Sequence, residues 1–233
     1  MDVKVYQLGV VEYQQAADLQ VRLAGEIAAG RQSPALLLLE HPHVYTFGRQ
    51  GNLGNLLWSE AQLTERGVSI YHSDRGGDVT YHGPGQLVGY PILPLGETGT
   101  LEYLRRLEET LISTLADYGI SAVRVEGQTG VWVPSSNGSA PPAKIASIGV
   151  RVDANRITRH GFAFNVNPDM AYWHGIIACG LENQSKASMA ELLDPAPTIG
   201  EVSVKVIDHF SAVFDCQIEL AKLPKEVGYE SED

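Results

Sequence analysis

The sequence predicts an α+β fold with a mixed, mainly antiparallel sheet flanked by helices. Strand patterns and helix patterns occur in blocks along the chain rather than in strict strand–helix–strand alternation, which is typical of this fold class. Residues 121–166 form the clearest block, because their hydrophobic runs have the length and composition of strands. The four strands expected there are Ala122–Val125, Val131–Val133, Ile145–Val152 and Ile157–Val166.

Three elements are expected at the start of the chain. Residues from Val3 to Leu8 alternate between apolar and polar and predict a strand. Residues 12–29 predict an amphipathic helix that ends at Gly30. Ala35 to Leu39 predict a buried strand. The apolar positions expected to face inward from the helix are Ala17, Val21, Ala24 and Ala28.

Glycines dominate the next part of the chain. Residues 41–57 are expected to form an irregular loop, because they hold Gly48, Gly51 and Gly54. Val68 to His72 predicts a strand that leads into a second glycine-rich segment, residues 75–86. Leu87 to Leu93 predicts the strand that leads out of it.

Two further helices have recognisable ends. Thr100 is expected to cap a helix that Gly119 stops. Ser188 and Glu191, like Thr198 and Glu201, have the spacing of a capping box. The first helix has an apolar stripe of Leu101, Leu104, Leu107, Leu111 and Leu115, and the helix after Thr198 has one of Val202, Val206, Phe210 and Val213. Residues Pro134 to Pro142 are expected to connect two strands of a hairpin.

Composition narrows the classes of function. The chain has 233 residues, which suits a single domain spanning 1–233. A net charge of −11 argues against nucleic acid as a partner. The longest aliphatic block, Ala35 to Leu39, is too short to span a membrane, and the first residues lack a signal-peptide pattern. We therefore expect a cytoplasmic protein without a membrane partner.

The cysteines and histidines give no sign of a metal or a cofactor. Cys179 and Cys216 fit neither a metal-ligand spacing nor a disulfide framework. Neither an HExxH nor a CxxC motif is present. We expect no metal site and no cofactor.

Residues 75–86, Arg-Gly-Gly-Asp-Val-Thr-Tyr-His-Gly-Pro-Gly-Gln, are the most informative segment. They are expected to form neither a regular helix nor a regular strand. Glycines allow a ligand to approach the main chain closely. A surface turn is the alternative, but an arginine, a tyrosine and a histidine between the glycines favour a binding loop.

This segment resembles the signature of the octanoyltransferases of lipoate biosynthesis, a pattern close to RGGxxTxHGPGQ, at every fixed position. The resemblance implies the fold of the biotin and lipoate protein ligases, with a core at about residues 31–215. It also implies that the segment binds substrate. The residues concerned are Arg75, Gly76, Gly77, Asp78, Val79, Thr80, Tyr81 and His82.

The resemblance extends to a cysteine and a lysine. Cys179 precedes Gly180, whereas Cys216 lacks a glycine turn or a basic neighbour and is expected to be structural. In the family the acyl-accepting cysteine lies in a PCG segment, and here Ala178 stands in place of the proline. Lys144 begins a KIAxIG pattern that the family shares. The resemblance implies a catalytic pair in which the Lys144 ammonium lowers the pKa of the Cys179 thiol. From the residues alone, a buried inert cysteine and a solvated lysine remain alternatives.

Two other strands resemble substrate-lining strands of the family. The residues are Ser147, Ile148 and Gly149 in one strand and Gly161, Phe162 and Ala163 in the other. The second belongs to a run that is similar to HGxAxNV and begins at His160. His160 could equally face solvent, and the aromatic and aliphatic members could belong to the core rather than to an acyl pocket.

The activity that the resemblance implies is acyl transfer. An octanoyl group would pass from octanoyl-acyl carrier protein to Cys179 as a thioester. It would then pass to a lysine of lipoyl domains, on 2-oxoacid dehydrogenase subunits and the glycine cleavage H protein. Two alternatives remain open, an ATP-dependent lipoate or biotin protein ligase and a non-catalytic acyl-binding module. Because both protein substrates would be acidic, we expect an arginine patch at the site, formed by Arg49, Arg75, Arg151 and Arg159.

Overall fold

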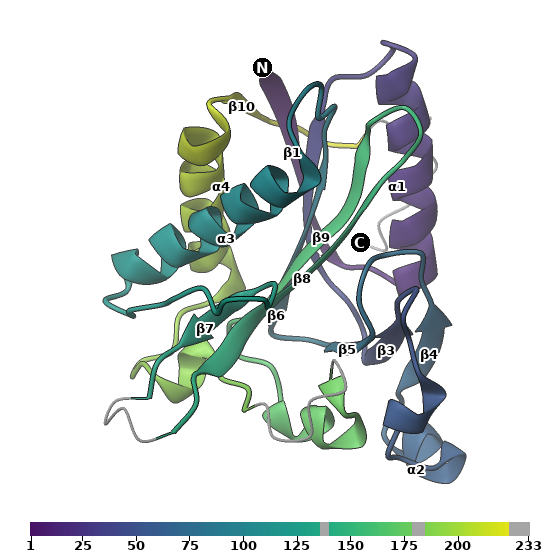
Figure 1. Ribbon diagram of the computed structural model, residues 1–233, viewed down its shortest axis with the longest axis vertical. Helices are drawn as coiled ribbons and strands as arrows, with labels where there is room; N and C mark the ends of the chain where they lie inside the picture. The colour runs from purple at the N-terminus through teal and green to yellow at the C-terminus, as the bar shows by residue number, and fades with distance from the viewer. Residues whose placement is uncertain (136–139, 179–184, 224–233) are drawn as a thin grey trace.

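A computed structural model describes residues 1–135, 140–178 and 185–223. The main sheet in these ranges has the strand order β10-β1-β2-β6-β9-β8-β7 (Figure 1). Strand β1 is parallel to both of its neighbours, and the other four pairs are antiparallel. The prediction of a mixed, mainly antiparallel sheet is therefore confirmed. The strands are β1 (Asp2–Val10), β2 (Ala35–Glu40), β6 (Gln86–Ile92), β7 (Val131–Val133), β8 (Ala143–Val152), β9 (Thr158–Asn165) and β10 (Gln217–Leu220).

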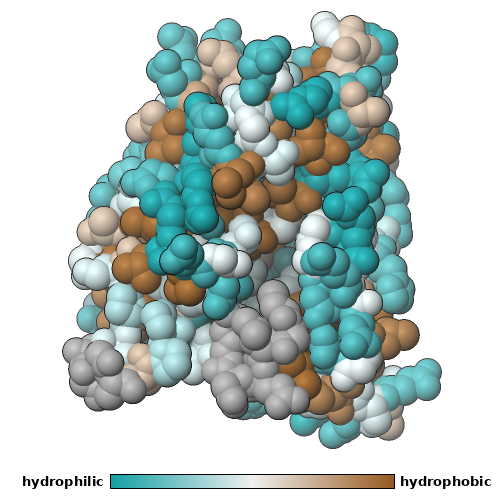
Figure 2. All heavy atoms as spheres, in the orientation of Figure 1, coloured by the Kyte–Doolittle hydropathy of each residue, from teal (hydrophilic) through white to brown (hydrophobic). Residues whose placement is uncertain are grey.

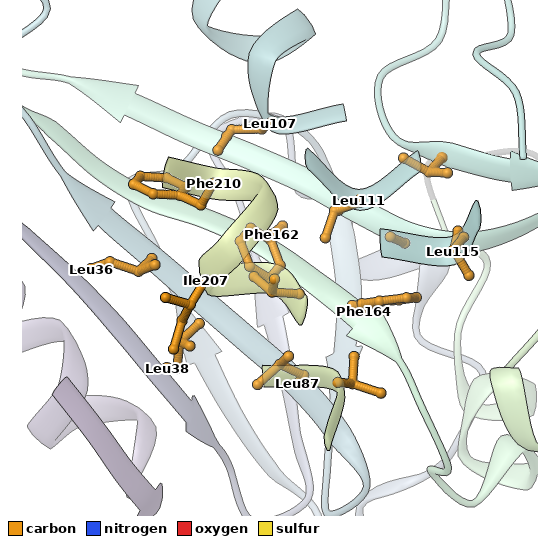
Figure 3. Close-up of a cluster of buried hydrophobic side chains, with 14 of the residues drawn as sticks. Leu36, Leu38, Leu87, Leu107, Leu111, Leu115, Phe162, Phe164, Ile207 and Phe210 are labelled. Atoms are coloured by element: carbon orange, nitrogen blue, oxygen red, sulfur yellow. The ribbon is translucent and has the colours of Figure 1, made fainter. Parts of the chain in front are cut away.

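Helices cover both faces of this sheet. Helix α1 (Tyr13–Ala28) lies on one face, and α3 (Thr100–Asp117) and α4 (Ile199–Phe214) lie on the other (Figure 1). Successive side chains of a strand point to opposite faces, so β2 supplies both layers. Leu36 and Leu38 pack with α3 and α4, whereas Leu37 packs with α1. Figure 3 shows the larger layer, in which Leu36, Leu38, Leu87, Phe162 and Phe164 of the sheet meet Leu107, Leu111 and Leu115 of α3 and Phe210 of α4.

A second, three-stranded sheet has the order β4-β3-β5. Its strands are β3 (Val44–Phe47), β4 (Ser69–His72) and β5 (Val79–His82). Two predictions are wrong here, because residues 41–57 contain a strand and the glycine-rich segment contains another. The glycines only flank these strands, whose own residues are β-branched or aromatic and buried.

Several helix details also differ from the predictions. In α1, Val21 and Ala28 are exposed rather than buried. The buried face of the helix instead contains the large side chains of Leu19, Leu23 and Ile27. In α3, Leu101 is exposed, and Gly99 rather than Thr100 is the N-cap. Residues 122–125 form only a bridge between Val123 and Trp132 rather than a strand. Both predicted capping boxes are confirmed, before the 3-10 turn η4 (Met189–Glu191) and before α4.

A third hydrophobic cluster joins the small sheet to the segment that leads toward Cys179. Tyr45, Phe47 and Tyr81 of the sheet pack with Trp173 and Ile176. Trp173 belongs to the 3-10 turn η2 (Met170–Gly175), and the turn η1 (Leu53–Asn55) and helix α2 (Glu60–Glu65) lie in the connection between β3 and β4. Among the described residues, the helices are all too short or too polar to cross a lipid bilayer.

Candidate active site

A cavity of about 670 Å³ lies between the glycine-rich segment and strands β8 and β9. Figure 2 shows a hollow in the middle of the face that it draws, where hydrophobic residues lie between hydrophilic ones. The predicted substrate-binding residues line the cavity, with Tyr81 as the exception. Tyr81 of β5 is instead fully buried, and its hydroxyl is 2.9 Å from Nδ1 of His43.

The glycine-rich segment is held to both sheets through its main chain. The Gly76 amide donates to the Val150 carbonyl of β8 at 3.0 Å, and the Gln50 amide donates to the Gly77 carbonyl at 3.1 Å. The approach is close, since a Cβ on Gly48 would lie 2.3 Å from that Gly77 carbonyl oxygen. Gly77 has a φ of +86°, a conformation that favours glycine. Glycine is therefore required here by geometry.

Arg75 is buried and holds this loop to strand β3. Its guanidinium donates to the Thr46 carbonyl at 2.6 Å, to the Thr46 hydroxyl at 3.0 Å and to the Gly76 carbonyl at 2.9 Å. Only 8% of its surface is exposed. Arg75 therefore cannot serve a docking patch, and that part of the arginine prediction is wrong.

Two more of the predicted arginines, Arg151 and Arg159, form ion pairs with Asp74. Its carboxylate is 2.6 Å from Nη2 of Arg159, 3.2 Å from Nε of Arg151 and 2.7 Å from Nε2 of His160. The hydrogen bond with His160 and the pairing with Arg159 lower the pKa of Asp74 below its usual value. Arg151 and Arg159 thus tie β8 and β9 to the residue that precedes the glycine loop.

His160 lines the cavity and is 3% exposed, so the solvent-facing alternative is wrong. Its φ of +57° is unusual within a strand, and its amide donates to the Gln20 side chain of α1 at 2.6 Å. Burial lowers the pKa of His160, although the neighbouring Asp74 opposes the shift.

The inner wall of the cavity holds a second buried histidine with fixed partners. His82 Nδ1 lies 2.8 Å from the Gln86 side-chain oxygen, and the Gln86 amide donates to the Asn165 oxygen at 2.9 Å. Asn165 in turn donates to the Ala187 carbonyl at 3.0 Å. These partners place the proton on Nδ1 and leave Nε2 as an acceptor. Burial lowers the pKa of His82 well below 6.5, so the ring is neutral.

His41 lies behind this wall, with Nδ1 at 2.6 Å from the Val11 carbonyl and Nε2 at 2.8 Å from the Tyr90 hydroxyl. Burial lowers its pKa to about 4. In the unfolded chain the His41 ring binds a proton near pH 6.5, whereas in the folded chain it stays neutral down to about pH 4. The free energy of unfolding therefore falls as the pH decreases from 6.5 to about 4, by about 1.4 kcal/mol per pH unit.

In His41→Gln, which keeps a donor and an acceptor, we expect the loss of unfolding free energy between pH 7 and pH 5 to be smaller by about 2 kcal/mol. Urea unfolding of both proteins at the two pH values measures it, and equal losses would contradict the buried neutral state.

Lys144 lies at the other end of the cavity wall, at the start of β8, and is 5% exposed. Its ammonium donates to the Thr129 carbonyl at 3.2 Å and lies 4.6 Å from the centre of the Trp132 ring. The solvated-lysine alternative is therefore wrong.

The loop that carries Thr129 is itself anchored by a buried carboxylate. Glu108 of α3 is 0% exposed, and it accepts from the Gly130 amide at 3.1 Å. Arg105 at 2.6 Å and Arg124 at 3.1 Å balance its charge. Glu108 thus helps to fix the carbonyl that receives the Lys144 ammonium.

Cys179 lies outside the described residues, but both flanks of its segment are anchored. Upstream, the Ile177 amide donates to the Asn55 carbonyl at 2.8 Å, and Asn55 donates to Asp78 of the glycine-rich segment. Downstream, the Lys144 amide donates to the Ser185 carbonyl at 2.8 Å. Ala178 lines the same cavity as Lys144, and consecutive Cα atoms are about 3.8 Å apart.

Cys216 lies elsewhere. It is buried in the hydrophobic layer between the sheet and α4, and burial raises the pKa of its thiol. The expectation that it is structural agrees with this position. Sequence reasoning gave no cavity role to several other wall residues, which belong to no shared local motif. They include Tyr13, Gln50, Tyr90, Thr129 and Lys186.

Comparison with known proteins assigns the family. Residues 12–211 match the family described as the lipoyl protein ligase A/B catalytic domain. An octanoyltransferase of Chloroflexus aggregans is 44% identical over 91% of this chain and 94% of its own length. One of Cytophaga hutchinsonii is 41% identical over 93% of this chain and 94% of its own. The chain belongs to the octanoyltransferase family. It is thus an acyltransferase enzyme that moves octanoyl groups in protein lipoylation, with an acyl donor and lipoyl-domain acceptors.

Solved structures show the same fold at low identity. A lipoate-protein ligase A bound with ATP has a TM-score of 0.80 at 14% identity, covering 98% of this chain and 92% of its own. A bi-partite lipoate protein ligase from Thermoplasma acidophilum gives 0.79 at 14%, covering 98% and 89%. A biotin protein ligase from Aquifex aeolicus gives 0.52 at 14%, covering 92% and 70%. These likenesses confirm the predicted ligase-like fold.

Proposed function

We propose that the octanoyl group travels from octanoyl-acyl carrier protein through a thioester on Cys179 to a lysine of a lipoyl domain. The observation that carries this proposal is the cavity itself, whose wall combines the glycine-rich segment, the buried Lys144 ammonium and Ala178, the chain neighbour of Cys179. The acceptors would be the lipoyl domains of 2-oxoacid dehydrogenase subunits and the glycine cleavage H protein. A cytoplasmic location and a single catalytic domain belong to the same proposal.

In the first step the Cys179 thiolate attacks the carbonyl carbon of the donor thioester. A new sulfur–carbon bond forms, the old one breaks, and the carrier thiolate leaves and takes a proton from the Lys144 ammonium, which becomes a neutral amine. The thiolate is the reactive form of cysteine, and a nearby ammonium favours it. Lys144 is the group that we assign to this task. Main-chain N–H groups of the glycine-rich segment would stabilise the oxyanion.

In the second step an acceptor lysine, as the free amine, attacks the Cys179 thioester. The carbon–nitrogen bond forms as the carbon–sulfur bond breaks, Lys144 accepts the amine proton, and the thiolate returns. A thioester-to-thioester exchange is nearly isoenergetic, whereas thioester-to-amide transfer is downhill, so no ATP is required. A ligase mechanism, by contrast, requires ATP.

The cavity wall would hold the acyl chain. One side of the cavity is lined by Gly76, Gly77 and Thr80 of the glycine-rich segment. Another side is lined by Ser147, Ile148 and Gly149 of β8. Phe162 and Ala163 of β9 add apolar surface next to Gly161. Pockets for small apolar ligands are built in this way.

Gly77→Val tests the role of the glycine loop. A β-branched residue at a φ of +86° is strained, and it would displace the main chain next to the acyl thioester. We expect octanoylation to slow by at least about 10-fold, since strain of this kind costs about 1–3 kcal/mol. Reaction of Cys179 with a small alkylating agent should stay near the wild-type rate. Normal octanoylation kinetics would show that the loop is only a turn.

The proposed reaction is tested by transfer from octanoyl-carrier protein to an isolated lipoyl domain, with EDTA and without nucleotide. We expect full activity, and free octanoate alone should not be used. An absolute requirement for ATP would instead support a ligase mechanism.

A further inference from the structure

A second cavity, here called the Trp173 groove, adjoins the first. It has a volume of about 440 Å³, and its wall includes Trp173, His174, Ile177, Ala178, Lys186 and Glu191. Ala178 and Lys186 line both cavities. The two spaces therefore meet at the residue that precedes Cys179.

A donor thioester has two arms that diverge from one carbonyl carbon, the acyl chain and the thiol-bearing arm. If the carbonyl carbon reacts beside Ala178, each arm needs its own path away from that point. The first cavity accounts for the acyl chain. We infer that the Trp173 groove binds the phosphopantetheine arm of the acyl donor, an inference that rests on the proposed function.

The polar groups of the groove match that arm. Trp173 is 7% exposed, and its indole N–H has no acceptor among the residues described. An unmet buried donor is costly, and the arm carries two amide carbonyls that could accept it. Lys186 lies with its ammonium 5.5 Å from the centre of the Trp173 ring, and His174 is exposed at the groove. Both can contact a phosphate.

Among the described residues of the groove wall, Glu191 is the carboxylate, and it does not oppose this assignment. Glu191 accepts from the Ser188 amide at 2.9 Å and from the Ser188 hydroxyl at 3.0 Å. These bonds, which form the capping box of η4, engage the Oε2 oxygen of Glu191. The carboxylate is therefore directed to its own main chain.

The acceptor lysine is the competing occupant, and two features argue against it. The Lys186 ammonium would repel a protonated amine but attract the anionic phosphodiester of the arm. The groove is also of the size of a small-molecule site, larger than an unbranched four-carbon amine requires. We therefore assign the groove to the donor.

The test separates the phosphate from the rest of the donor. Octanoyl-4′-phosphopantetheine and octanoyl-pantetheine differ only in that group. The rate of Cys179 acylation is followed by intact mass for the wild type, Lys186→Met, Trp173→Phe and the control Lys205→Met. Lys205 is half-exposed on α4 and paired with Asp117, so it matches the charge removed.

We expect the wild type and Lys205→Met to prefer the phosphorylated donor by about 10-fold, the worth of one charge-assisted hydrogen bond. Lys186→Met should lose this preference. Trp173→Phe should slow both donors alike by roughly 3- to 10-fold and keep the preference.

Three results would overturn the inference: equal wild-type rates with both donors, a preference that survives in Lys186→Met, or variants that slow only the transfer from octanoyl-enzyme to a lipoyl domain. The last would assign the groove to the acceptor. Failure of the proposed function itself would look different, because the wild type would then form no acyl-enzyme with either donor.

Discussion

Replacing Cys179 with serine or alanine should lower turnover by on the order of 10³-fold or more, because both half-reactions pass through its thiolate. A serine hydroxyl is far less acidic than a thiol, so the Lys144 ammonium cannot ionise it. Turnover is measured as octanoylation of a lipoyl domain, with thermal unfolding as a check that the fold persists.

Cys216→Ser is the matched control, since it removes a thiol from the hydrophobic layer and leaves the cavity untouched. It should keep the wild-type rate at some cost in stability. An inactive Cys216 variant beside an active Cys179 variant would reverse the assignment of the nucleophile.

Lys144→Ala should slow the acylation of Cys179 by roughly 10- to 10³-fold at pH 7, because loss of an adjacent cation raises a thiol pKa by about 1–3 units. The direction of the shift in the pH–rate profile is testable. The variant should recover as the pH rises through the new thiol pKa, so its pH–rate profile shifts toward alkaline values. A profile that falls in parallel with the wild type at every pH would contradict this role.

Lys144→Arg separates the two tasks of the lysine. A guanidinium keeps the charge but does not release its proton in proteins, so it cannot cycle as the base for the incoming amine. We expect it to restore thioester formation better than amide formation, each measured in a single turnover. Equal recovery of both steps would remove the base role.

The sequence was most informative where local pattern determines structure. An unbroken aliphatic run predicted β2 as a buried strand, and its side chains pack in both hydrophobic layers. The capping boxes at Ser188 and Thr198 depend only on residues three apart, and both formed. By contrast, β3 and β5 are short and flanked by glycines. Their strand structure depends on pairing with each other, which no local pattern shows.

The same division holds for the site. The glycine-rich segment and Lys144 belong to recognisable motifs, and the structure places them on one cavity. Tyr13 and Tyr90 reach its inner wall from separate elements through tertiary packing. The arginine prediction was wrong for Arg75 for a related reason. Sequence gives the number of arginines, but not that Asp74 engages Arg151 and Arg159 or that Thr46 engages Arg75.

The decisive step of the proposed reaction is the formation of an octanoyl thioester on Cys179. Its most direct test is to mix the wild-type protein with octanoyl-carrier protein in EDTA, without nucleotide and without acceptor, and to locate any added mass by peptide analysis. We expect one octanoyl group on Cys179, labile to hydroxylamine as a thioester is, and its loss on addition of a lipoyl domain. An unmodified Cys179 in a protein that still octanoylates the lipoyl domain would contradict the account.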